Sequence, residues 1–70
     1  MTAVEQTVIL VLELTEGRSA ESAAWTMQDS LKAHPVPELR AFLAERGVRF
    51  PARSRRAEFV DEIVQIYTAA

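Results

Sequence analysis

Apolar residues along this chain recur mainly at intervals of three and four positions, which is the spacing of one face of a helix. Polar residues fill the positions between them, and Gly, Pro and Ser separate the periodic segments. This pattern predicts four helices, at about residues 3–16, 20–34, 37–46 and 55–68. Because short connections join them, we expect a compact all-α domain of four helices.

The first segment contains the run Val8–Leu12, whose β-branched content also fits a buried strand. A helical projection leaves Ile9 as the one large exception and gathers the other apolar residues on one side: Val4, Val8, Leu10, Val11, Leu12 and Leu14. Thr2 and Glu5 have the spacing of a capping box, which also favours a helix. The alternative is a strand over residues 7–14 that pairs with its copy in a dimer.

Small and cyclic residues mark the expected helix ends. Gly17 and Gly47 suit the left-handed position that follows a helix, Ser19 and Ser54 can cap the second and fourth helices, and Pro37 fits the first turn of the third. We expect the apolar faces of these three helices to contain Ala20, Ala23, Ala24, Met27, Leu31, Leu39, Phe42, Leu43, Phe59, Val60, Ile63, Val64, Ile66 and Tyr67.

Composition limits the class of protein. Seventy residues form one domain, residues 1–70, near the lower limit of size for folding alone. The chain has no Cys, so disulfides and Cys-based zinc sites are excluded, and its 49% apolar content argues against disorder. The apolar run Val8–Leu12 is too short to cross a membrane, and no basic signal-peptide segment precedes it. We therefore expect a cytoplasmic protein without a membrane partner.

Charge is distributed unevenly around a net value of −2. Residues 1–38 contain two basic and six acidic residues, a net charge of −4, whereas residues 39–70 contain six basic and four acidic residues, a net charge of +2. Five of the eight basic residues lie within one short stretch: Arg46, Arg49, Arg53, Arg55 and Arg56. Such asymmetry indicates a localised anionic partner.

The same part of the chain contains, in order, Val36, Glu38-Leu39-Arg40, Leu43, Arg46-Gly47-Val48, Arg56-Ala57-Glu58-Phe59-Val60 and Ile63. This series resembles the SAP motif and its helix–extended loop–helix relatives, among them LEM-type and Rho N-terminal modules. The resemblance covers residues 36–66, slightly under half of the chain, and implies a helical hairpin. For SAP domains it implies DNA binding by the loop and the start of the second helix. Ser54 stands where the SAP pattern usually has Gly, and the loop is somewhat longer.

A basic loop that opens onto a helix N-terminus can hold a phosphate, because backbone N–H groups there are unsatisfied and the helix dipole is positive. Arg53, Arg55 and Arg56 would add bidentate donors, and Arg46 and Arg49 would extend the patch. We therefore expect a DNA-binding module that contacts the phosphate backbone through these five residues. In the alternative interpretation, the arginines form a solvated surface and pair with neighbouring carboxylates.

Enzyme chemistry has little support in the sequence. There is no Cys, no Gly-rich phosphate loop and no metal-ligand spacing, and the carboxylates lie on the expected solvent faces. His34, the only His, has no second nitrogen or sulfur ligand beside it in the pattern. We expect no catalytic residue, metal, cofactor or small-molecule substrate.

A role in protein binding is the alternative function. The first half of the chain is acidic, Trp25 projects away from the apolar stripe of the second helix, and the first helix has an apolar excess that includes Ile9 and Leu10. Trp is favoured at the centre of protein interfaces. These three residues are therefore candidates for contact with a protein partner or with a second copy in a homodimer.

Overall fold

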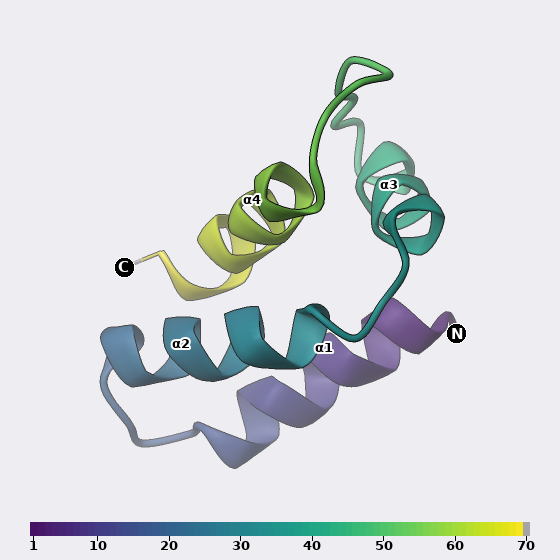
Figure 1. The fold of residues 1–70 in the computed structure, drawn as a ribbon. Helices are drawn as coiled ribbons and strands as arrows, with labels where there is room; N and C mark the ends of the chain where they lie inside the picture. Colours follow the sequence, from purple (N-terminus) through teal and green to yellow (C-terminus); the bar gives the residue numbers. More distant parts are fainter. Residues whose placement is uncertain (70) are drawn as a thin grey trace.

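The computed structural model describes residues 1–69. In that range the chain forms four α-helices and no strand, namely α1 (Ala3–Leu14), α2 (Ala20–Leu31), α3 (Val36–Glu45) and α4 (Arg56–Thr68) (Figure 1). The prediction of an all-α domain of four helices is confirmed. Because residues 7–14 lie within α1, the alternative of a strand in this segment is wrong.

Each helix packs against two others, so the four form a closed ring of contacts. The antiparallel pair α1 and α2 lies on one side, and α4 and α3 cover it from the other, with α2 against α4 and α1 against α3 (Figure 1). The loop between α3 and α4 extends away from this body (Figure 1). It contains the basic residues Arg49, Arg53 and Arg55. The fold therefore presents the basic loop at one end of the molecule.

Local hydrogen bonds explain most of the helix ends. The Thr2 hydroxyl accepts from the Glu5 N–H group at 3.1 Å, and the Ser19 hydroxyl accepts from the Ser22 N–H group at 3.1 Å. Gly17 and Gly47 have φ angles of +84° and +79°, as their positions after a helix require.

Two helices end two or more residues before their expected boundaries. α1 stops at Leu14 rather than at residue 16, and the Thr15 hydroxyl there donates to the Val11 carbonyl at 2.7 Å. α2 stops at Leu31 rather than at residue 34, because the N–H groups of Ala33 and His34 turn to carbonyls three residues back. Such tighter bonds are common in the last turn of a helix.

The start of α4 corrects the prediction for Ser54. The N-cap is Arg55, whose N–H group donates to the Glu58 carboxylate at 2.7 Å, while the Ser54 N–H group donates to the Pro51 carbonyl in the preceding turn. A Glu in the third helical position supplies this bond to the cap residue. The Glu58 carboxylate therefore satisfies the N–H group of the cap residue, and the predicted hydrogen bond from the first turn of α4 to the Ser54 hydroxyl is not formed.

Within residues 1–69 the core contains eleven buried apolar residues: Val4, Val8, Val11, Met27, Leu31, Leu39, Phe42, Leu43, Phe59, Val60 and Ile63. Those from α2, α3 and α4 were all expected, but Ala20 is exposed and Ile66 is 43% exposed. On α1 the expected apolar face is too broad, since Leu10 is 55% and Leu14 is 61% exposed. α1 buries a narrow stripe of valines, and its leucines lie on the two flanks that α2 and α3 leave uncovered.

Candidate nucleic-acid interface

The basic loop is attached to the core by Phe50. Phe50 is partly buried, and its ring meets the fully buried ring of Phe59 edge to face, with 5.0 Å between ring centroids. Such aromatic pairs stabilise by about 0.5–1.5 kcal/mol beyond the area that they bury. The middle of the loop is therefore fixed to the base of α4.

Arg40 holds the loop from the other side. Its Nη1 donates to the Phe50 carbonyl at 2.9 Å, and its Nη2 donates to the carbonyls of Pro51 and Ala52 at 3.2 and 3.4 Å. The guanidinium also lies 4.9 Å from the centroid of the Phe59 ring. One side chain from α3 thus satisfies three consecutive loop carbonyls, which would otherwise depend on water. The sequence identified Arg40 only as part of the SAP-like series and gave no sign of this role.

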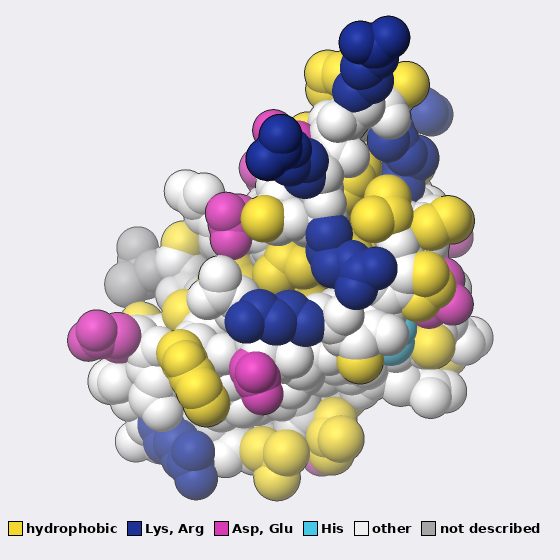
Figure 2. Space-filling view, viewed as in Figure 1, with side chains coloured by type: hydrophobic (Ala, Val, Ile, Leu, Met, Phe, Trp, Pro, Cys, Tyr) yellow, Lys and Arg dark blue, Asp and Glu magenta, His cyan; other side chains and the backbone are white. Residues whose placement is uncertain are grey.

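Four of the five predicted binding arginines lie at this end of the molecule, and all four are exposed; we call them the loop arginines: Arg49, Arg53, Arg55 and Arg56. None of them takes part in an ion pair with residues 1–69. Figure 2 shows Lys and Arg side chains gathered on one face, from the loop at the top of the view down to α2. Their positive charge therefore faces solvent.

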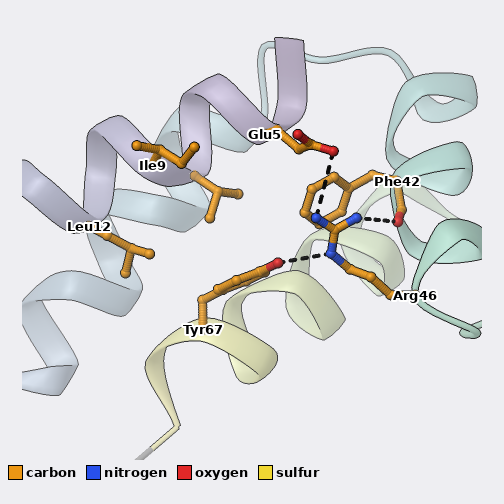
Figure 3. A pocket seen from close by; sticks show the side chains of 7 residues that line it. Glu5, Ile9, Leu12, Phe42, Arg46 and Tyr67 are labelled. Atoms are coloured by element: carbon orange, nitrogen blue, oxygen red, sulfur yellow. Dashed lines mark hydrogen bonds and ion pairs between the residues drawn. The ribbon is translucent and has the colours of Figure 1, made fainter. Parts of the chain in front are cut away.

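Arg46 differs from the loop arginines because its guanidinium contacts an aromatic ring, a hydroxyl group and a backbone carbonyl within the fold (Figure 3). It lies 3.5 Å from the centroid of the Phe42 ring, donates from Nε to the Tyr67 hydroxyl at 2.9 Å, and donates from Nη1 to the Phe42 carbonyl at 3.0 Å. Nη2 is 3.8 Å from the Glu5 carboxylate. Tyr67 is near the C-terminal end of α4, about 16 Å along the helix from Arg56. The structure therefore does not bring Arg46 together with the loop arginines.

A basic residue from another helix joins the loop arginines instead. The Nη1 of Arg56 donates to the Lys32 carbonyl at 2.8 Å, which ties the start of α4 to the end of α2. Beside this bond is an open pocket of about 260 Å³, lined by Gln28, Lys32, Arg56, Ala57 and Val60. Sequence analysis missed Lys32 and Gln28 because they lie in the acidic half of the chain, and no local pattern relates them to the loop.

The three residues predicted to contact a protein partner are all at the surface. Trp25 is 68% exposed, Leu10 is 55% exposed and Ile9 is 43% exposed. Ile9 lines a second, smaller pocket together with Leu12, Tyr67 and the internally bound Arg46 (Figure 3). Trp25 lies on α2 and the other two lie on α1, so they do not form one cluster within a single element.

His34 has a structural position. Its Nε2 is 2.8 Å from the Thr7 hydroxyl of α1, and its Nδ1 is 3.2 Å from the Glu38 carboxylate of α3.

In the part of the chain that the structure describes, no group of three or more His, Asp or Glu side chains could hold a metal ion. Likewise, none of the helices of residues 1–69 has the length and apolar character needed to cross a membrane.

Comparison with known proteins adds no relative. No protein-family model matches the chain, and no curated protein or solved structure matches it significantly.

Proposed function

We propose that this protein is a non-enzymatic, cytoplasmic DNA-binding module of the SAP-like type. It contacts the phosphate backbone through the loop arginines and the start of α4. One observation carries this proposal: the four loop arginines are exposed at one end of the molecule, and no carboxylate of residues 1–69 pairs with them. Long basic side chains whose charged groups form no ion pair are expected where a protein neutralises an anion.

The chemistry of the site suits phosphate groups. An Arg guanidinium can donate two parallel hydrogen bonds to a phosphate, and the charges make these bonds stronger than neutral ones. The N–H groups of the first turn of α4 lie at the positive end of the helix dipole. Arg40 and Phe50 hold the loop in place, so that less conformational entropy is lost on binding. Contacts of this kind position a protein on DNA and read no base sequence.

The test is the affinity for a duplex of about 16 base pairs, measured by fluorescence anisotropy as a function of salt. Four phosphate contacts predict a slope of about −3 to −4 in log K against log[salt], which is about a hundredfold loss of affinity between 50 and 200 mM salt. The variant with both Arg53→Ala and Arg56→Ala should weaken binding and reduce the slope by about 2. Circular dichroism of the variant shows whether the fold is retained.

Arg18→Ala is the matched control. Arg18 is exposed between α1 and α2, and its replacement removes the same charge away from the loop. We expect this variant to change affinity only slightly. An unchanged affinity and slope in the Arg53 and Arg56 double variant would show that the proposed site is wrong.

A second candidate function is dimerisation through α1. The observation in its favour is that four large aliphatic side chains of this one helix are exposed by 37–61%: Ile9, Leu10, Leu12 and Leu14. Exposed apolar surface of this kind often marks a protein interface. Sedimentation equilibrium over a range of concentrations should then show a dimer that Leu10→Asp abolishes. Gln6→Asp, which adds the same charge at another exposed position of α1, should leave the dimer intact. A monomer at all concentrations would exclude this function.

A further inference from the structure

From Lys32, which joins the loop arginines, an exposed polar side of α2 leads to an exposed aromatic side chain. Trp25, Gln28 and Lys32 are spaced by three and four residues, so they lie on one side of the helix. Gln28 and Lys32 line the pocket beside Arg56, and Trp25 follows them toward the N-terminal end of α2. The helical rise places Trp25 about 5 Å along the axis from Gln28 and about 10 Å from Lys32. Figure 2 shows exposed hydrophobic side chains on the same face as the Lys and Arg side chains.

Trp25 contributes nothing to the core that explains its position. It is 68% exposed, whereas the buried residues of α2 are Met27 and Leu31 on the opposite side. An indole ring with this exposure is accessible to a flat aromatic group. A nucleic-acid base is such a group, and stacking of bases on aromatic side chains is the usual way in which proteins hold single strands.

We propose that this face of α2 binds single-stranded nucleic acid, with an unpaired base stacked on Trp25 and the adjoining phosphates on Lys32 and Arg56. The inference rests on the proposed function, because it takes phosphate binding at the loop as given and extends the path of the strand. Val60 and Ala57 add apolar lining to the pocket that Lys32 and Arg56 also line. A strand bound at the loop arginines would therefore pass Lys32 and then reach Trp25.

The charges next to Trp25 favour a single strand over a duplex. Glu21 and Asp29 are four residues before and after Trp25 on the helix, and both are exposed. Their carboxylates repel a phosphate close to the indole but have little effect on the face of a neutral base. In a duplex the base faces are stacked within the helix and the phosphates lie outside, so a duplex would present the wrong group to this part of α2. An unpaired strand can place its base there and keep its phosphates on the cationic side.

Intrinsic fluorescence provides the test, because Trp25 is the only Trp in the chain. The protein is titrated with oligo(dT) and oligo(rU) of eight nucleotides and, separately, with a blunt hairpin duplex whose two strands are joined by a non-nucleotide linker, so that it has no unpaired bases. We expect saturable quenching with a single strand and none with the hairpin. The relative affinities of oligo(dT) and oligo(rU) identify DNA or RNA as the preferred source of the strand.

Substitutions separate this inference from the proposed function. Trp25→Ala should weaken the binding of oligo(dT) by about 5- to 150-fold and leave binding of the hairpin duplex unchanged. Trp25→Phe should retain part of the affinity, because a smaller ring still stacks. The matched control is Ile66→Ala, which removes another exposed apolar side chain, 43% exposed, from α4; it should change neither affinity.

Three results would overturn the inference. In the first, oligo(dT) binds without quenching and Trp25→Ala binds it as tightly as the unmodified protein does; phosphate binding at the loop would then stand alone. In the second, the hairpin quenches Trp25 as strongly as the single strand. In the third, neither nucleic acid binds at low salt, which refutes the proposed function as well.

Discussion

Arg40 ties the basic loop to α3, and its removal tests whether this side chain determines the geometry of the loop. The Arg40→Ala variant loses two good hydrogen bonds, to the carbonyls of Phe50 and Pro51, and a weaker one to Ala52. It also loses the contact between the guanidinium and the Phe59 ring. No other side chain of residues 1–69 donates to these three carbonyls.

The expected cost follows from the exposure of these groups. A hydrogen bond from a charged donor contributes about 1.5–3 kcal/mol when buried, but water can replace it at a partly exposed carbonyl. We therefore count about 1 kcal/mol for each of the two shorter bonds and about 0.5 kcal/mol for the contact with the ring. The free energy of unfolding should fall by about 2–2.5 kcal/mol. For a domain of this size the midpoint of thermal unfolding should fall by about 8–20 °C.

Thermal unfolding followed by circular dichroism measures the effect. Arg53→Ala is the matched control, because Arg53 lies in the same loop but makes no side-chain hydrogen bond within residues 1–69; its effect should be below about 0.5 kcal/mol. Arg40→Lys keeps the charge but lacks the planar fork that reaches several carbonyls, so it should lose more than half of the stabilisation. Equal midpoints for the Arg40→Ala and Arg53→Ala variants would refute this account of the loop.

Two further predictions concern residues near the loop. Arg46→Ala should cost about 1–2 kcal/mol of stability through the lost contacts with Phe42 and Tyr67, and should leave the salt slope of DNA binding unchanged; a reduced slope in a folded variant would place Arg46 in the binding surface. Gly47→Ala should cost about 1–2 kcal/mol by thermal unfolding, because nothing lies within 4 Å of the added Cβ atom and only the left-handed φ of +79° opposes it. Gly17→Ala, with a φ of +84° and equally open surroundings, should cost nearly the same amount, and a large difference would contradict a purely conformational origin.

Local signals in the sequence were sufficient to predict the number of helices and the positions of several of their ends. Ser19 caps α2 and Gly47 follows α3 with a positive φ, as their residue types predict, because capping depends on backbone groups only a few positions away. The apolar faces of α3 and α4 were also readable, since each has one continuous stripe flanked by charged residues. The prediction of Ser54 as the cap of α4 was wrong. Arg55 is the cap residue, and its N–H group donates to the Glu58 carboxylate.

Only part of the candidate site could be predicted from the sequence. The charge cluster predicted the loop arginines, but Lys32 comes from another helix and joins them through the bond from Arg56 to its carbonyl. Arg46 belongs to the same cluster in the sequence, yet it stacks on Phe42 and bonds to Tyr67, which is twenty-one residues away. No pattern of neighbours along the chain distinguishes an arginine whose guanidinium will bond to groups on other helices from one whose guanidinium will face only solvent.

The sequence by itself determined that this chain forms four helices and that its positive charge is concentrated between α3 and α4, because periodicity, capping and charge order are properties of neighbouring residues. Only the tertiary structure decided which face of α1 is buried, since this helix is apolar on several sides and its valines are selected by the fit against α2 and α3. The tertiary structure also decided which arginine side chains are available to bind an anion. A guanidinium is retained within the fold wherever packing brings an aromatic ring and two or three oxygen acceptors within reach, and these acceptors come from helices that are distant in the sequence.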